Sequence, residues 1–223
     1  MKITSKYPDQ IHLAPAAMQQ LLTQKLPQLI VMAARLEDVN VTENEVKKVL
    51  QMAMGTSLAQ TDYDVVAQLS LAWKMILAET GPVNLALEQR VNTIIDLDSA
   101  APGMLRNGTG SVMTTRGEFM PPEINEKQEA AYLNELLTST KSTTEKALTL
   151  MYHNMRNQLF YDGNKRTALI IANKLMLDQG AGLICIPLAK FTTWMNKLTS
   201  FYFTNNMTEL TDWTYQNGII TGK

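Results

Sequence analysis

Cysteine is nearly absent from this sequence, whose 223 residues include one, Cys185. A single thiol excludes an internal disulfide and suits a reducing compartment, so we expect a cytoplasmic protein. Cys185 lies in the apolar run Leu183-Ile-Cys-Ile186. Cysteines in such runs are usually buried and behave as small hydrophobic side chains, so Cys185 is not expected to be a nucleophile.

Long apolar runs and an excess of charge of one sign are also missing. No stretch approaches the length of a membrane span, and the N-terminal residues lack the continuous apolar segment of a secretory signal. The formal net charge is −1 and the pI is near 6.1, which argues against a general nucleic-acid or membrane-surface binder. Hydrophobic residues make up 45% of the chain, so a buried core is expected.

What the sequence does contain is apolar residues at helical spacing, which predicts a mainly α-helical fold. Thr42 and Ser142 each precede a glutamate by three residues, the capping-box pattern that begins a helix. Pro27 is expected to begin or kink a helix, Pro82 to lie near the start of another, and Gly55 to end one. The expected helices cover about residues 16–24, 27–36, 62–78, 123–137, 191–202 and 210–216. Others are expected after the caps at Thr42 and Ser142, after the motif loop, and from about Pro82, the last with Ala86, Leu87, Val91 and Ile94 facing inward.

Residues 99–122 interrupt the helical pattern with several glycines and prolines. Val112 and Phe119 flank Thr115-Arg116-Gly117, a spacing that suits a short β-hairpin. A simple surface loop is the alternative. Loops of this length inside compact domains tend to be functional, however, which argues against a simple surface loop.

The most informative stretch is Gln158-Leu-Phe-Tyr-Asp-Gly-Asn-Lys-Arg-Thr-Ala168, where an acidic, glycine-containing turn precedes an apolar helix pattern. The free N–H groups and the dipole of a helix start favour an anion, and Lys165 and Arg166 in the first turn favour a phosphate. Asp162 is able to hold a divalent cation that the phosphates share. The same residues also suit an ordinary turn, in which Asp162 or Asn164 caps the helix.

This stretch resembles the signature of the Fic (Fido) family, His-Pro-Phe-x-Asp/Glu-Gly-Asn-x-Arg-x-x-Arg. Phe160, Asp162, Gly163, Asn164 and Arg166 are in register with the signature. The chain departs from it at two places, with Gln158 at the histidine position and Leu169 at the second arginine. The run Asn-Lys-Arg-Thr-Ala is similar to the Doc-like branch, which also lacks that second arginine but usually keeps the histidine.

The resemblance implies a Fic-like helical domain with a short β-hairpin flap at about residues 101–122 and a motif loop at 158–169. Thr114, Thr115 and Arg116 then belong to the flap that docks a target protein as an added strand. Residues 32–40 partly resemble the family's inhibitory segment, and Glu37 lies at the position of the inhibitory glutamate. We expect N-terminal helices at residues 1–60 and a Fic-like core at residues 61–223, together forming one compact unit.

The resemblance also implies a ligand, namely ATP or another nucleotide with Mg²⁺. Asp162 is then the metal ligand, and Gly163, Asn164, Lys165 and Arg166 bind the phosphates. Family members transfer AMP, or less often another phosphate-bearing group, to a side-chain hydroxyl of a protein. In relatives with the second arginine, that residue contacts the terminal phosphate and pairs with the inhibitory glutamate. With Leu169 in its place, Glu37 has no evident partner at that position, and a solvated or capping acid near a helix end is the alternative for Glu37.

The residue at the histidine position bears on whether this protein is an enzyme, and three interpretations of its function remain. The amide of Gln158 is not basic, and loss of a general base typically costs about 10²–10⁴ in rate. His153 lies five residues earlier, on a different helix face, and is not a convincing substitute. The first reading is a slow or unusual transferase, and the second is a catalytically inactive pseudo-Fic that acts as a regulatory or protein-binding module. A helical interaction domain whose motif only caps a helix is the third.

Overall fold

The computed structural model describes residues 5–52 and 57–222. These residues form a mainly helical domain, as the sequence predicts, with two small antiparallel strand pairs. The α-helices are α1 (Pro15–Ala34), α2 (Glu43–Leu50), α3 (Gln60–Ala78), α4 (Leu85–Ile95), α5 (Glu126–Thr138), α6 (Thr143–Asn157), α7 (Asn164–Asp178), α8 (Phe191–Thr204) and α9 (Thr208–Asn217). Two short 3₁₀ helices, η1 (Arg35–Glu37) and η2 (Leu188–Lys190), lead into a turn and into α8.

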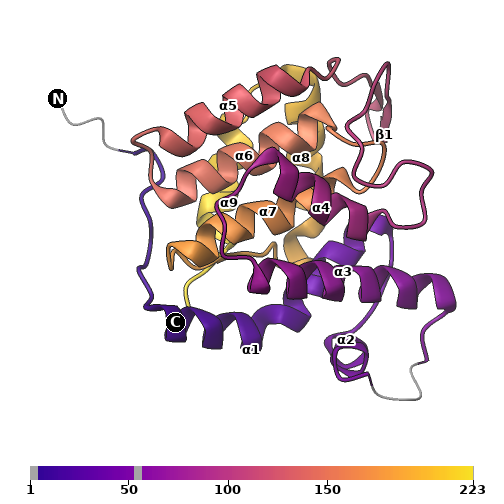
Figure 1. Cartoon of the computed structure of the whole chain (residues 1–223), viewed down its shortest axis with the longest axis vertical. Coiled ribbons are helices and arrows are strands. Elements are labelled where there is room, and N and C mark those ends of the chain that lie inside the picture. The colour runs from indigo at the N-terminus through magenta and orange to yellow at the C-terminus, as the bar shows by residue number, and fades with distance from the viewer. Residues whose placement is uncertain (1–4, 53–56, 223) are drawn as a thin grey trace.

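Helix α7 lies at the centre of the molecule (Figure 1). It packs against α6 most extensively, and also against α4, α3 and α1. Most of its residues are buried on every side, as expected for a helix enclosed by others rather than one with a single apolar face. The motif helix is therefore the element around which the other helices are arranged.

Helix α1 differs from the prediction, since the two helices expected at 16–24 and 27–36 form one continuous helix. Pro27 lies inside it and lacks the N–H that would bond to the preceding turn. Leu22 on one side of the proline and Leu29 and Ile30 on the other are fully buried. Burial on both sides stabilises the continuous helix against the cost of the proline.

The predicted helix starts are confirmed in part. At α2, Thr42 and Glu45 form the complete capping box. At α6, the Ser142 side chain accepts from the Glu145 backbone N–H, but the Glu145 carboxylate binds Ser5 and the Lys6 backbone instead of closing the box.

The boundaries of two helices were predicted less well. Helix α4 begins at Leu85 after an Asn84 cap, so Pro82 lies before it, and Ala86 is exposed rather than buried. Helix α2 ends at Leu50, and Gly55, which was expected to end it, lies outside the described residues.

The predicted hairpin is present, with β1 (Val112–Thr114) paired to β2 (Gly117–Phe119) and Val112 opposite Phe119. A second pair, β3 (Leu183–Ile184) with β4 (Ile219–Ile220), was not predicted. Two-residue strands carry no periodicity that a sequence pattern can reveal. This pair joins the residues after α7 to the end of α9.

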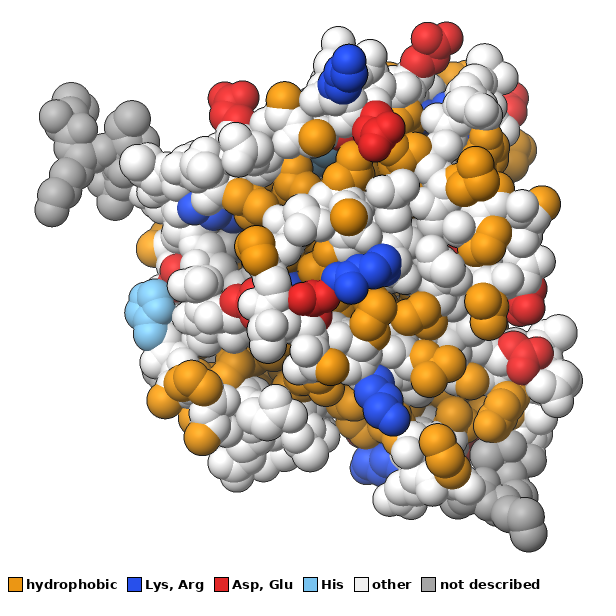
Figure 2. Space-filling model, viewed as in Figure 1, with side chains coloured by type: hydrophobic (Ala, Val, Ile, Leu, Met, Phe, Trp, Pro, Cys, Tyr) orange, Lys and Arg blue, Asp and Glu red, His pale blue; other side chains and the backbone are white. Residues whose placement is uncertain are grey.

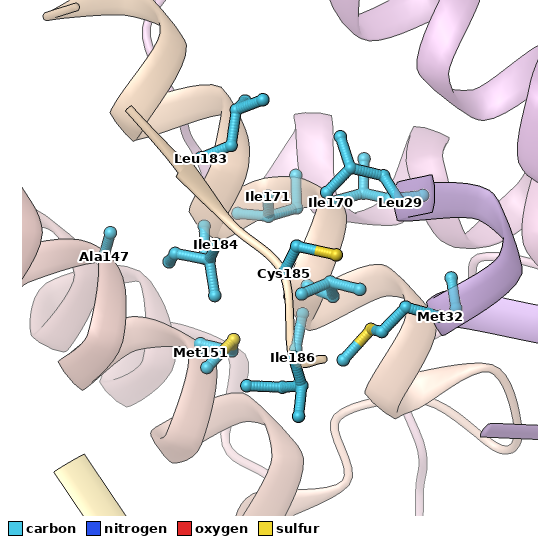
Figure 3. Close-up of a cluster of buried hydrophobic side chains, with 14 of the residues drawn as sticks. Leu29, Met32, Ala147, Met151, Ile170, Ile171, Leu183, Ile184, Cys185 and Ile186 are labelled. Atoms are coloured by element: carbon cyan, nitrogen blue, oxygen red, sulfur yellow. The ribbon is translucent and has the colours of Figure 1, made fainter. Parts of the chain in front are cut away.

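Figure 3 shows the core where β3 passes between helices. Ile184 and Ile186 lie among Met151 of α6 and Ile171 of α7, and Cys185 points toward Leu29 and Met32 of α1. All of these side chains are buried. The prediction of a small buried thiol at Cys185 is confirmed, and burial raises its pKa to about 12.

The surface carries both signs of charge. Figure 2 shows lysine, arginine, aspartate and glutamate interspersed over one face, with hydrophobic side chains scattered between them. Among the helices that the structure describes, none combines the length and apolar character that a membrane crossing requires.

Glu88 on α4 is a carboxyl group in the fully enclosed part of the core. Burial raises its pKa from the ordinary 4.5 to about 8, the Asn154 amide offsets part of that rise, and the Glu129 charge adds to it. Glu88 is therefore mostly protonated at neutral pH. A carboxyl whose folded pKa lies above its unfolded pKa stabilises the fold below pH 4.5, and that stabilisation is lost as the pH rises through 8.

We predict that the free energy of unfolding of the natural protein falls between pH 5 and 9 by up to about 1.4 kcal/mol per pH unit. Glu88→Gln should abolish most of this slope, because a neutral amide does not ionise. Denaturant unfolding at several pH values measures it, with exposed Glu118→Gln as the control. Parallel pH profiles for the natural protein and Glu88→Gln would contradict the prediction.

Candidate functional site

The start of α7 is shaped by Gly163, which occupies the N-cap position with a φ of +71°. A Cβ atom here would lie 2.8 Å from Cγ2 of Ile95 and 3.1 Å from Nδ2 of Asn92. Positive φ and the close approach of α4 both favour glycine. The loop therefore turns directly under the C-terminal end of α4.

Asn164 holds the loop closed rather than facing solvent. Its Oδ1 accepts from the Phe160 backbone N–H at 2.8 Å, and its Nδ2 donates to the Phe160 carbonyl at 2.9 Å. Phe160 in turn forms an isolated antiparallel bridge with Leu105. The side chain of Asn164 is thus used within the protein, and its backbone N–H is the part that remains for a ligand.

Within residues 5–52 and 57–222, the first turn of α7 has no side-chain cap at its N-terminus and contains no acidic residue. Asp162, one residue before the cap, accepts from the Gly163 N–H through Oδ1 at 2.6 Å, and two thirds (67%) of its side chain is exposed. The side-chain cap expected from Asp162 or Asn164 is therefore not formed, while an ordinary turn without such a cap remains the alternative to a phosphate site.

Arg166 lies under this turn with 4% of its side chain exposed. Its Nη1 donates to the Ile95 carbonyl at 3.2 Å, and its Nη2 is 3.9 Å from Oδ2 of Asp162. Its Nε is 2.8 Å from Oε1 of Glu37. Glu37 therefore pairs with the first motif arginine, Arg166, whereas the second arginine position is occupied by Leu169.

Carboxyl groups surround the Arg166 guanidinium. Burial raises the pKa of Glu37, while the charges of Arg166 and Lys165 lower it part of the way and Asp162 raises it further. Burial also raises the pKa of Asp96 at the C-terminal end of α4. Carboxylates around a buried arginine repel an incoming anion. An anion is therefore expected to bind strongly at Arg166 only when one of these carboxyl groups moves away or becomes neutral.

Gln158 ends α6 in the left-handed conformation, with a φ of +52°. Its side-chain Nε2 donates back to the Met155 carbonyl at 2.5 Å. Its backbone carbonyl accepts from Nε of Arg106 at 3.1 Å. The side chain at the histidine position is therefore held by its own helix, and as an amide it has no proton-accepting function.

Arg106 is a site residue that the sequence analysis did not single out. It is buried, and it donates to the backbone carbonyls of Asn157, Gln158, Gly108 and Pro122, while its own N–H donates to the Leu159 carbonyl at 2.7 Å. The only signal in the sequence was an arginine among glycines and prolines. Arg106 joins the base of the flap to the beginning of the motif loop.

The hairpin packs against α8 through Phe119. The Phe119 ring stacks on the Tyr202 ring with 5.0 Å between centroids, and the Arg156 guanidinium lies over the Phe119 ring. A cavity of about 380 Å³ separates β1 from α8. Thr114 and Thr115 line it from the flap, and Lys165 lines it from the motif helix. Arg116 lies instead over the Phe203 ring, at 5.2 Å.

The two histidines do not enter this site. Nε2 of His153 is 2.7 Å from Oε2 of Glu129, and its ring stacks on Tyr132. His12 is in the segment before α1. In the described part of the chain, no cluster of three or more His, Cys, Asp or Glu residues has the arrangement of a metal site.

Comparisons with known proteins agree with this geometry. The model of the Fic/DOC family matches residues 75–176, from within α3 through the flap and the motif to α7. None of the curated proteins matches the chain.

Three solved structures illustrate the similarity of fold. A Fic-domain signalling protein from Bacteroides thetaiotaomicron is 19% identical, with a TM-score of 0.76 over 92% of this chain and 87% of that one. Fic-1 from C. elegans is 13% identical, with a TM-score of 0.73, and the match covers 92% of this chain but 63% of that one. A Fic family protein from Desulfovibrio desulfuricans is 11% identical, with a TM-score of 0.71 over 94% and 73% of the two chains.

The fold is thus that of Fic proteins, an α-helical domain with a hairpin beside a central motif helix. Residues 75–176 match the model of the Fic/DOC family, so the resemblance seen in the motif is confirmed. Members of this family generally transfer AMP or a related nucleotide group to proteins, using a nucleotide with Mg²⁺.

Alanine substitutions at two glycines with positive φ test whether α4 restrains the motif loop. Gly163→Ala should lower the free energy of unfolding by roughly 2–4 kcal/mol, because it adds left-handed strain and a contact with Ile95. Gly108→Ala, also at positive φ but with nothing within 4 Å of the new Cβ, should cost only about 1 kcal/mol. Chemical denaturation compares them, and equal losses would show that α4 does not restrain the loop.

Proposed function

We propose that the start of α7 binds a nucleotide, or another ligand that bears phosphate, and that transfer to a protein is slow. The observation that carries this proposal is the start of α7, which no described side chain caps, above buried Arg166. Free backbone N–H groups, the helix dipole and a guanidinium together favour phosphate oxygens. Lys165 adds a second positive charge on the side that faces the cavity between β1 and α8.

Magnesium fits this arrangement only together with the ligand. Asp162 offers one largely exposed carboxylate, and Mg²⁺ is commonly held by one or two carboxylates plus phosphate oxygens and water. A divalent cation would neutralise phosphate charge next to Asp162. The protein's own contribution is to hold Oδ1 of Asp162 through the Gly163 N–H, so that Oδ2, which lies 3.9 Å from Nη2 of Arg166, is the oxygen that would meet a cation.

The transfer step explains why we expect slow chemistry. A target hydroxyl would attack the α-phosphorus, forming a P–O bond to the target while the bond to pyrophosphate breaks. The hydroxyl proton must pass to an acceptor, and Gln158 offers none. Binding and transfer therefore depend on different residues. The uncapped start of α7 and Arg166 support ligand binding, whereas no residue described above supports fast transfer.

Glu37 gives the proposed site a means of control. Its carboxylate contacts the same guanidinium that a phosphate would use. Since one guanidinium face serves one anion at a time, a bound phosphate competes with Glu37. We propose that Glu37 restrains ligand binding through Arg166.

The second candidate function is a pseudo-Fic module that binds a ligand or a protein partner without transfer. The Gln158 side chain favours it, because its amide is bonded to Met155 of its own helix. In either case, Thr114, Thr115 and Arg116 are the flap residues that would meet a protein partner, and its free β1 edge would accept an added strand. The lone buried thiol remains the argument for the cytoplasm.

Changing the two members of the Arg166–Glu37 pair should move ligand affinity in opposite directions. Arg166→Ala should weaken Mg²⁺–ATP binding at least tenfold, about 1.4 kcal/mol or more. Glu37→Gln should strengthen it roughly threefold to tenfold, because the competing charge is gone. Isothermal titration calorimetry measures both changes.

Glu79→Gln is the matched control, since Glu79 pairs with Arg90 away from the motif. It should leave the affinity unchanged. Equal affinity in Arg166→Ala and the natural protein would contradict the proposed phosphate site, and equal affinity in Glu37→Gln would contradict restraint by Glu37.

We expect Gln158→His to restore transfer that the natural protein performs weakly. The natural protein and the variant are incubated with Mg²⁺, α-labelled ATP and a cell lysate, and label on protein bands is counted. A gain of roughly 10²–10⁴ is expected from a general base. Labelling by the natural protein at the variant's rate would show that no histidine is needed, and would overturn the account of slow chemistry.

A further inference from the structure

Asn92 of α4 is a fully buried amide that makes contacts in three directions (0% exposed). Its Nδ2 donates to the Asp162 carbonyl at 2.8 Å and to Oγ1 of Thr167 at 3.2 Å. Its Oδ1 accepts from the Gly103 N–H at 3.0 Å. Asn92 thus bonds both to the motif segment and to the loop that begins the flap.

The two bonds from Nδ2 lie on either side of Gly163. Asp162 precedes the left-handed glycine and Thr167 follows in the first turn of α7, and the same nitrogen would lie 3.1 Å from a Cβ atom at Gly163. A donor placed there fixes the direction of the Asp162 peptide. It therefore fixes where the Asp162 carboxylate and the first free N–H groups of α7 point.

The bond to Gly103 fixes the other loop. Gly103 has a φ of +71°, and a Cβ atom there would lie 2.6 Å from the Gln89 carbonyl oxygen and 2.1 Å from Oγ1 of Thr93. The chain at Gly103 lies directly on the backbone of α4. Through one amide, α4 holds the entry to the flap and the turn of the motif in one geometry.

A comparison within the same chain shows what a purely structural asparagine looks like. Asn173 of α7 is also fully buried, donates to the Leu169 and Ile184 carbonyls at 3.0 Å each, and accepts from the Ile184 N–H at 2.8 Å. Its partners belong to its own helix and to β3. Asn92 has the same chemistry, but its partners are the two loops of the candidate site.

We propose that Asn92 is a positioning residue, which orients the phosphate-binding turn of α7 and couples it to the flap. The inference rests on the proposed function for its ligand, but the residue acts through Asp162, Gly163 and Gly103 and touches no ligand itself. Because each buried bond is made to backbone or to a side chain of a site loop, losing them frees the loops while the core remains packed.

The test compares Asn92→Ala with Asn173→Ala, which removes an equally buried amide with equally many bonds. Both variants should be destabilised to a similar extent in chemical denaturation. Asn92→Ala alone should weaken Mg²⁺–ATP binding at least tenfold in calorimetry. In amide hydrogen exchange, Asn92→Ala should speed exchange at Gly103 and Gly163, whereas Asn173→Ala should speed it at Ile184.

Asn92→Asp tests the bond to Gly103 separately from the bond to Asp162. It replaces the alanine variant if that variant does not fold. An aspartate keeps the acceptor for the Gly103 N–H but has no donor for the Asp162 carbonyl. Exchange should then stay slow at Gly103 and become fast at Gly163. Fast or slow exchange at both positions would contradict separate contacts by the two ends of the side chain.

Failure of this inference is distinguishable from failure of the proposed function. If the natural protein binds no Mg²⁺–ATP, the nucleotide proposal fails, and the exchange pattern still decides whether Asn92 holds the two loops. If the natural protein binds and Asn92→Ala binds as well as Asn173→Ala does, Asn92 is a structural residue and the positioning role is overturned.

Discussion

The start of α7 must be buried without being capped, and the arrangement around it follows from this constraint. Backbone N–H groups at a helix start need partners, and an enclosed helix cannot leave all of them to water. Here the Asn164 side chain bonds to both backbone groups of Phe160, and Nδ2 of Asn92 donates to the Asp162 carbonyl, so the loop before the helix is held from the inside. In the part of the chain that the structure describes, the first turn itself has no side-chain cap.

The flap depends on the same region. Arg106 bonds to the carbonyls at the end of α6, Asn92 bonds to Gly103, and Phe119 stacks on Tyr202 of α8. The hairpin is small, and two-stranded hairpins are marginal on their own. Its position is therefore set by these three contacts at its base and along one side.

Local features of the fold could be predicted from the sequence, because their causes lie within a few residues. The capping box at Thr42 and the opposition of Val112 and Phe119 across the hairpin are such cases. The motif predicted the fold of the central region. The predicted helix boundary at Pro27 was wrong, because the local effect of the proline is offset by burial of α1 against helices distant in the sequence.

The contacts that organise the site could not be predicted, because their partners are far apart in the chain. Nothing in the sequence near Glu37 indicates that it reaches Arg166 rather than the position of Leu169. Asn92 is one polar residue in an amphipathic helix, and its role is visible only once α4 lies over the loop. Arg106 is likewise defined by carbonyls from three separate segments.

The burial of Cys185 has a practical meaning beyond packing. It is the single thiol of the chain, it lies in the core beside α1, and burial raises its pKa to about 12, so almost no thiolate exists at neutral pH. In the native state this sulfur is shielded from alkylating reagents, and it becomes reactive when the core opens. The protein thus carries a built-in reporter of global opening, and a cysteine introduced on the exposed flap would be the one site that a fluorescent maleimide labels in the folded molecule.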